Sequence, residues 1–180
     1  MDVNKQTYKK KYNQVKILGE IDKSMYEFDT LQIWQKDVVE KLEQMESGKI
    51  LALQVVGGDI YHLCHFFIVQ DSYKYILMLM PSSLNDMYEI IFDAREKGWD
   101  GDTIVIGLNR NLCTENTYYF IDKMANGVFF YEGIRRYFKK VKIFVYSHHL
   151  IEMYHIDAFN WQIYRTRNPD IPIKQYDLNW

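Results

Sequence analysis

The sequence has little of what marks disulfide-rich or membrane-spanning proteins. It holds two cysteines, Cys64 and Cys113, and three prolines, and its apolar runs are much shorter than a bilayer span. Two cysteines are too few for a small fold held together by disulfides, and no apolar stretch follows Met1 as a secretion signal would require. We therefore expect a cytoplasmic protein with no membrane partner.

A strong net charge is also lacking, because 22 Lys and Arg oppose 24 Asp and Glu. Such a balance creates no overall field that would attract nucleic acid or an anionic membrane. Any electrostatic attraction of a partner must therefore come from a local group of charges.

The hydrophobic content is sufficient for one folded domain. In a chain of 180 residues, 48% are hydrophobic and 16% aromatic, so a substantial core can be buried. We expect a single α/β domain over 1–180, with a mixed sheet. The basic start, 1–13, is expected to be flexible, and 168–180, with Pro169 and Pro172, to form an extended tail.

Three helices follow from apolar residues at helical spacing. The first is expected over 30–46, with Asp29 and Gln32 as a capping pair and Gly48 as the stop. The second begins at Leu84 after Ser82 or Ser83 as the cap and ends before Gly98. The third is capped by Thr114 and runs to about Ala125.

The strand predictions divide the chain further. Apolar runs over 50–56, 60–70 and 73–80, separated by short turn sequences, predict an antiparallel meander that ends at Pro81. The run 103–106 predicts a buried strand, parallel to the one before Pro81 and joined to it through the second helix. Further strands are expected at 15–18, 128–137, 142–146 and 160–165, with a short helix near 150–155. The segment 128–140 could equally be a helix.

This order of elements resembles the GCN5-related N-acetyltransferases, as does the local sequence Ala94-Arg-Glu-Lys-Gly-Trp99, Thr103-Ile-Val-Ile-Gly-Leu-Asn109 and Tyr119-Phe-Ile-Asp-Lys-Met124 before Gly127. The resemblance implies acetyl-coenzyme A as cofactor. Backbone of Met78, Leu79 and Met80 would then meet the pantetheine arm, and Ser82 and Ser83 would meet the pyrophosphate.

Two positions depart from that family. The loop 81–86 has neither glycine nor arginine for the pyrophosphate, and it contains Asp86. Ile121 stands where the family has its catalytic tyrosine, which leaves Tyr118 and Tyr119 as neighbouring candidates on different sides of the helix. Both departures count against acetyl transfer.

One local segment combines positive charge with aromatic rings. This pairing suits phosphate contact with base stacking, or docking on an acidic protein surface. The residues that we expect to bind a partner are Arg135, Arg136, Tyr137, Lys139, Lys140 and Lys142. The alternative is a solvated face beside the core.

The five histidines fall into two groups, His62 and His65 around Cys64, and His148, His149 and His155 around Glu152. On a helix, His148, Glu152 and His155 would share a face and could bind a divalent metal, although no recognised zinc motif is present. Partly exposed histidines are the alternative. Arg110, just after the strand 103–106, could hold an anion or belong to an ordinary turn.

Two functions remain open. The first is a non-catalytic binding protein, an inhibitor or adaptor such as a phage or mobile element could encode, that grips a protein or ribonucleoprotein partner. Direct binding of nucleic acid is a weaker form of this hypothesis. The second is a divergent acetyl-coenzyme A dependent N-acetyltransferase. The binding hypothesis is favoured because it needs no residue that the sequence lacks.

Overall fold

The fold is built on a six-stranded sheet. The computed structural model describes residues 23–55, 60–70, 74–149, 160–166 and 174–175. Five strands run parallel in the order β2 (Tyr75–Leu79), β3 (Thr103–Gly107), β6 (Lys142–Ser147), β1 (Ile50–Val55) and β7 (Trp161–Thr166). The short strand β8 (Lys174–Gln175) pairs antiparallel with β7 at the edge.

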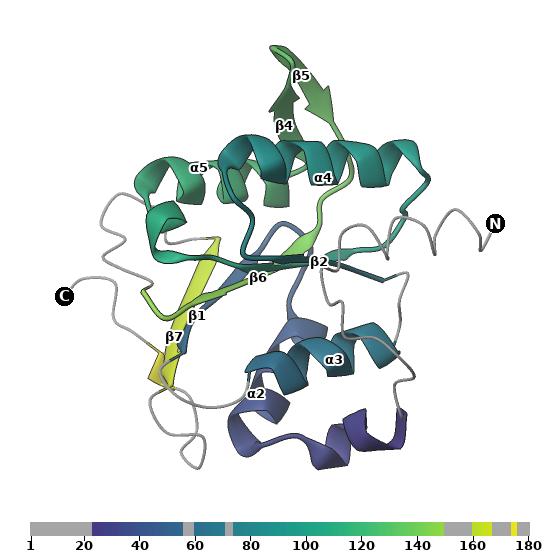
Figure 1. The fold of residues 1–180 in the computed structure, drawn as a ribbon, viewed down its shortest axis with the longest axis vertical. Helices are drawn as coiled ribbons and strands as arrows, with labels where there is room; N and C mark the ends of the chain where they lie inside the picture. The colour runs from purple at the N-terminus through teal and green to yellow at the C-terminus, as the bar shows by residue number, and fades with distance from the viewer. Residues whose placement is uncertain (1–22, 56–59, 71–73, 150–159, 167–173, 176–180) are drawn as a thin grey trace.

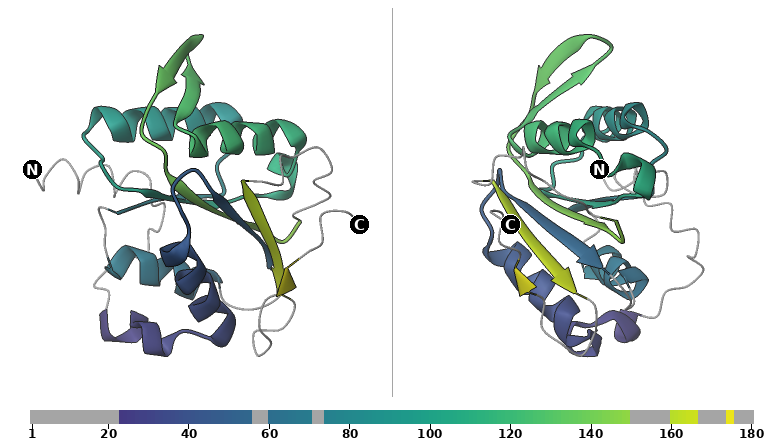
Figure 2. Two further views of the ribbon diagram at one scale, coloured as in Figure 1. Left: turned by 180° about the vertical axis from the view of Figure 1, so that it is seen from behind. Right: turned by 90° about the vertical axis from the view of Figure 1, so that its left-hand side faces the viewer.

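Helices cover both faces of this sheet (Figures 1 and 2). On one face lie α4 (Leu84–Glu96) and α5 (Glu115–Ala125), and on the other lie α2 (Ile33–Gln44) and α3 (Ile60–Gln70). Alternate strand residues serve the two layers, so that Ile104 faces α4 and α5 while Val105 faces α2 and α3. Burial on both faces explains why these strands are apolar at nearly every position.

The mixed α/β class and the central part of the prediction are confirmed. The segment from Tyr75 to Ala125 forms a strand, a helix, a parallel neighbouring strand and a second helix. Ser83 caps α4 by accepting a hydrogen bond from the Asp86 N–H, and Thr114 caps α5 by accepting from the Thr117 N–H. The cap of α2 differs from the predicted pair, since Gln32 and Gln35 cap each other.

The predicted antiparallel meander is wrong, because residues 60–70 form the helix α3. Every residue from Leu63 to Ile68 is buried, as is Ile60, whereas Tyr61 is 62% exposed, so this helix is buried over most of its surface. A short, almost continuously apolar run suits a buried strand or a buried helix equally well by pattern. The tertiary structure selects the helix, which covers one face of the sheet.

The strand pairing also differs from the order expected of an acetyltransferase. β1 lies between β6 and β7 and is parallel to both, rather than beginning a meander. β2 and β3 are paired in register from Tyr75 with Thr103 to Leu79 with Gly107. These two strands therefore do not splay apart, and no coenzyme-sized gap opens between them.

Residues 128–137 form a two-stranded hairpin that projects from the body beyond α4 and α5 (Figures 1 and 2). Its strands are β4 (Val128–Tyr131) and β5 (Ile134–Tyr137), which pair antiparallel. The two turn residues, Glu132 and Gly133, have φ values of 52° and 75°, as a type I′ turn requires. The predicted strand is confirmed here, and the helical alternative for 128–140 is wrong.

Several predicted features lie outside the described residues. These are the strand at 15–18, the helix near 150–155, the flexible start 1–13 and most of the tail 168–180. Among the residues that the structure does describe, no helix combines the length and the apolar character needed to cross a membrane.

Candidate functional site

The hairpin has an inner face that packs on α4. Side chains alternate along each strand, and the inner set includes Phe129, Tyr131 and Arg136. The Tyr131 ring stacks on Phe92 of α4, with centroids 4.3 Å apart and planes at 13°, and the Arg136 guanidinium lies 4.6 Å from the Phe92 ring centroid. These contacts fix the hairpin in position relative to the body.

The outer face of the hairpin carries exposed aromatic and basic side chains. Phe130 is 42% exposed and Tyr137 is 69% exposed. Between them, Arg135 lies 5.2 Å from the Phe130 ring centroid and donates a hydrogen bond of 3.3 Å to the Tyr137 hydroxyl. One cation is thus held between two rings that solvent can reach.

Helix α5 extends this face. Tyr119 is 65% exposed, and the Lys123 ammonium lies 5.3 Å from its ring centroid. Tyr119 is also close enough to Arg135 to act on its charge. We call Tyr119, Lys123, Phe130, Arg135 and Tyr137 the aromatic–basic face: three exposed rings and two cations from three elements.

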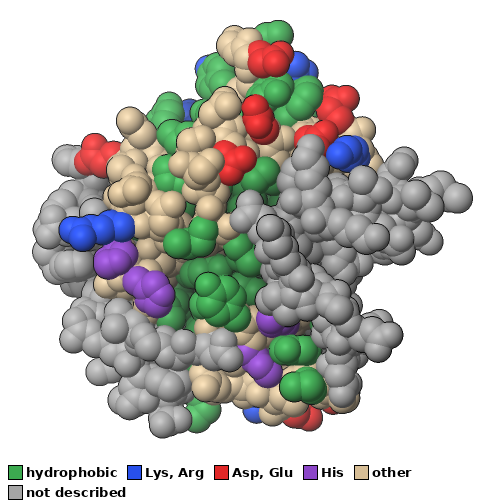
Figure 3. Space-filling model, viewed as in Figure 1, with side chains coloured by type: hydrophobic (Ala, Val, Ile, Leu, Met, Phe, Trp, Pro, Cys, Tyr) green, Lys and Arg blue, Asp and Glu red, His purple; other side chains and the backbone are tan. Residues whose placement is uncertain are grey.

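Electrostatics differ between the two sides of the hairpin. On the outer side, the hydrogen bond and the electrostatic attraction of Tyr137 raise the pKa of Arg135, so its charge is secure. On the inner side, burial raises the pKa of Tyr131, and the carboxylates of Glu132, Glu89 and Asp93 raise it further. Figure 3 shows acidic side chains around the region where the hairpin meets α4.

The structure separates the residues that the basic segment brought together in sequence. Arg135 and Tyr137 lie on the aromatic–basic face and Lys140 is exposed, but Arg136 packs inward on Phe92. Lys139 donates to the carbonyl oxygen of Asp100. Lys142 donates to the carbonyl oxygens of Leu42 and Glu43 at the end of α2. Lys142 therefore has a structural role at a helix end.

The residues that the resemblance assigned to a cofactor lie at the end of β2. Met78 and Leu79 are buried in the sheet, and Met80 is 55% exposed. The Asp86 carboxylate accepts hydrogen bonds from the backbone N–H and the hydroxyl of Ser82, while Ser83 caps α4. The N–H and hydroxyl of Ser82 and the N–H of Asp86 are thus engaged by side chains of the chain itself.

The two tyrosines considered for catalysis point to opposite sides of α5, as predicted. Tyr118 is 1% exposed and meets Trp161 edge to face, with centroids 5.9 Å apart. Tyr119 lies on the aromatic–basic face.

The two histidine groups are not adjacent. Figure 3 shows histidine side chains at two separate places on one face, on either side of an apolar hollow. His62 and Cys64 lie on the helix α3 rather than on a strand, and His148 makes a 2.6 Å hydrogen bond between Nδ1 and the Val55 carbonyl oxygen. Glu152 and His155 lie outside the described residues, among which no group of three potential metal ligands occurs.

Polar and thiol groups meet near the carboxyl ends of β6 and β3. The Cys64 thiol lies 3.6 Å from the Tyr146 hydroxyl, and the Cys113 thiol lies 3.2 Å from the Ser147 hydroxyl. Burial, followed by the Cys64 sulfur, raises the pKa of Tyr146 well above the ordinary tyrosine value. Arg110 is exposed in the short 3-10 helix η3 (Arg110–Leu112) that follows β3.

Sequence reasoning missed Phe130, Tyr119 and Lys123 as binding residues. The basic residues were identified because they are consecutive in the sequence, and residues of β4 and α5 are not part of that segment. A two-residue turn at Glu132-Gly133 fixes which side chains of 128–137 share a face of the hairpin. With that turn, Phe130, Arg135 and Tyr137 lie on one face and Arg136 on the other.

Comparison with known proteins gave no match to a family model, to a curated protein or to a solved structure.

Proposed function

We propose that this protein is a non-catalytic binding protein that holds a nucleic-acid strand, bare or within a nucleoprotein partner, on its aromatic–basic face. The observation that carries the proposal is the arrangement of Tyr119, Phe130 and Tyr137, all exposed, around the cations Arg135 and Lys123. Exposed rings stack on bases, and cations between them meet the phosphates.

The position of the face supports this role. A hairpin that projects from the body can lie along a nucleic-acid strand and contact several nucleotides. Packing of its inner side on Phe92 holds it in place. The near-neutral net charge fits an interaction confined to this local face, rather than one drawn by the whole molecule.

The acetyltransferase alternative has no such support. β2 and β3 pair along their whole length, and Asp86 occupies the donors of Ser82. Neither observation supports binding of acetyl-coenzyme A, so this activity is not proposed.

The test is titration of a fluorescently labelled single-stranded oligonucleotide of about 20 thymidines, followed by anisotropy at low salt. We expect Phe130→Ala and Tyr137→Ala each to weaken binding roughly 5- to 150-fold, the range that loss of one stacked base produces. Arg135→Ala should also reduce the slope of log affinity against log salt by about 0.7.

Matched controls are available elsewhere on the chain. Tyr61 is 62% exposed on α3, and Arg110 is exposed after β3, so Tyr61→Ala and Arg110→Ala test side chains of the same kinds away from the hairpin. Absence of binding by the wild type at low salt would overturn the proposal. Equal losses from Tyr61→Ala and Tyr137→Ala would do so as well.

A further inference from the structure

The carboxyl end of β6 lies where the connections of the sheet diverge. β1 is followed by α3 on one face of the sheet, and β3 is followed by α5 on the other face (Figure 1). β6 lies between these two strands and is parallel to both. In open α/β sheets, ligands bind at the carboxyl ends of the strands at such a point. The topology therefore marks this edge as the place for a ligand site.

Three exposed basic side chains gather at this end of β6. His148 and His149 follow the strand, and their ring centroids are 6.5 Å apart. The thiol of Cys113, directly after η3, lies 3.2 Å from the Ser147 hydroxyl at the end of β6. This contact holds η3, with Arg110, beside the two histidines. We call Arg110, His148 and His149 the carboxyl-edge basic group.

Two members of this group present polar atoms that the described part of the chain does not use. The Arg110 guanidinium makes no hydrogen bond or ion pair with a described residue. Nδ1 of His148 lies 2.6 Å from the Val55 carbonyl oxygen. Because a carbonyl oxygen can only accept, the proton is fixed on Nδ1, and Nε2 of the exposed ring is left for a ligand.

Exposed apolar side chains lie at the same edge. Tyr61 is 62% exposed in the first turn of α3, and it is near enough to Tyr146 of β6 to act on its hydroxyl electrostatically. Met80, 55% exposed, follows β2, and its N–H donates to the carbonyl oxygen of Gly107 at the end of β3. Figure 3 shows histidines beside a cationic side chain at the margin of an apolar hollow. An anion at the basic group can therefore carry a flat apolar part into that hollow.

We propose that the carboxyl-edge basic group binds the phosphate of a free mononucleotide, whose base lies in the apolar hollow. The planar guanidinium of Arg110 can donate two parallel hydrogen bonds to phosphate oxygens. Nε2 of His148 accepts from a protonated phosphate oxygen or, once protonated itself, donates to an ionised one. A metal ion fits less well, because Arg110 would repel it and the described ranges contain no group of three potential metal ligands.

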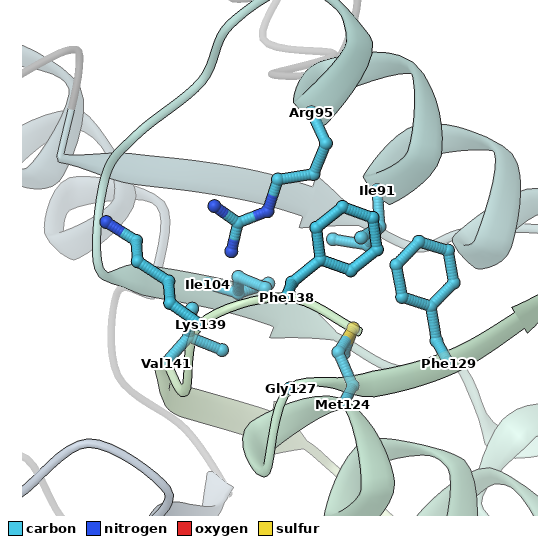
Figure 4. A pocket seen from close by; sticks show the side chains of 9 residues that line it. All are labelled: Ile91, Arg95, Ile104, Met124, Gly127, Phe129, Phe138, Lys139 and Val141. Carbon is cyan, nitrogen blue, oxygen red and sulfur yellow. The ribbon is translucent and has the colours of Figure 1, made fainter. Parts of the chain in front are cut away.

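The opposite edge of the sheet has no room for such a ligand near the hairpin. Figure 4 shows Arg95 beside Phe138 at the base of the hairpin, and the guanidinium lies 5.3 Å from that ring centroid. Lys139 donates to the carbonyl oxygen of Asp100, and the cavity between these side chains has room for about one water molecule. The nucleotide site is thus separate from the hairpin and does not depend on the function proposed for the aromatic–basic face.

The test is calorimetric titration of the full chain with adenosine monophosphate, with adenosine and with inorganic phosphate. The nucleotide should bind at least about 10-fold more tightly than adenosine, since only the nucleotide makes charged hydrogen bonds. It should also bind more tightly than phosphate, which leaves the hollow empty. Absence of heat from the nucleotide at millimolar concentration, or equal affinity for nucleotide and adenosine, would overturn the proposal.

Variants of the two phosphate partners make the test specific. Arg110→Ala removes the guanidinium, and His148→Asn keeps a donor for the Val55 carbonyl oxygen but has no group in place of Nε2. Each should weaken adenosine monophosphate roughly 10-fold, the loss expected for a hydrogen bond with a charged group. Lys140→Gln, which removes an exposed cation just before β6, is the control and should bind the nucleotide as the wild type does. Unchanged affinity in both Arg110→Ala and His148→Asn would contradict the assignment.

Two further measurements distinguish the other occupants. Heat from zinc chloride that His148→Asn abolishes, with none from the nucleotide, would assign the edge to a metal and overturn the proposal. In the oligonucleotide titration Arg110→Ala should bind as the wild type does, and a loss there would show that the strand itself occupies this edge. The nucleotide titration contains no oligonucleotide, so failure of this site and failure of the aromatic–basic face give different results.

Discussion

At the scale of single residues, Tyr146 shows how burial sets a response to pH. Its side chain is 8% exposed, and its hydroxyl lies 3.6 Å from the Cys64 sulfur. Burial therefore raises its pKa well above 10, the value in the unfolded chain. Below pH 10 the hydroxyl is protonated in both states, so the shift has no effect on stability there.

Above pH 10 the unfolded chain releases this proton while the folded protein retains it, so stability falls with rising pH. Tyr146→Phe should cost about 1 kcal/mol at pH 8, the usual value of a lost hydrogen bond. Between pH 8 and pH 11 the wild type should lose about 1.4 kcal/mol that the variant keeps. Urea unfolding at pH 8 and 11 measures both, and identical pH dependence of the two proteins would contradict the reasoning.

Gly127 ends α5 and shows a steric requirement. Its φ is 81°, and a Cβ atom there would lie 2.2 Å from the Phe138 carbonyl oxygen. Gly133 in the hairpin turn has φ 75° but no atom within 4 Å of such a Cβ.

Gly133→Ala should therefore cost about 1–2 kcal/mol, from backbone conformation alone. Gly127→Ala should cost at least twice as much, because the backbone at Phe138 must also move away from the added Cβ atom. Chemical denaturation of the two variants gives the comparison. Equal losses of unfolding free energy would show that the close approach to Phe138 does not add to the cost of the substitution.

At the scale of elements, the hairpin depends on α4 for its orientation. Phe92 contacts Tyr131 and Arg136 on the inner face and takes no part in the aromatic–basic face. Its substitution therefore changes the support of the hairpin without changing the residues proposed to bind.

Phe92→Ala should lower the free energy of unfolding by about 1–3 kcal/mol, less than for a fully buried phenylalanine. It should also speed hydrogen exchange of the hairpin amides and weaken oligonucleotide binding, whereas Phe92→Leu should do so less. Exchange measured by mass spectrometry with overlapping peptides gives the local effect. Unaltered binding in Phe92→Ala would show that the hairpin does not need this support.

At the scale of the whole molecule, one sheet separates two apolar layers. Trp34 is fully buried in the layer of α2 and α3, and Trp99 is 3% exposed in the layer of α4 and α5. Each of the five parallel strands contributes side chains to both layers, so neither layer can unfold while leaving the sheet intact. This geometry favours the single domain that the length of the chain predicts.

Variants that retain either Trp34 or Trp99 as their only tryptophan should report this cooperativity. Replacement of the other tryptophans by phenylalanine will destabilise each variant, so each is compared with its own far-ultraviolet circular dichroism. In both, fluorescence and dichroism should give one coincident transition in urea. Two separated transitions would show two independently folding units.

The sequence alone predicts the helices α2, α4 and α5, the buried strand β3, and the caps of α4 and α5. These elements follow from periodicity and from capping residues, which act within a few positions along the chain. It also pointed to Arg135 and Tyr137, because charge and aromatic rings are properties of the residues themselves.

Tertiary contacts select the helix at residues 60–70, the position of β1 between β6 and β7, and the inward orientation of Arg136 with Tyr119 on the outer face. Each of these outcomes depends on partners distant in sequence, such as Ile50 beside Ile143 and Trp161. An apolar run is stabilised by burial in either conformation, and which one it adopts depends on the surface that buries it.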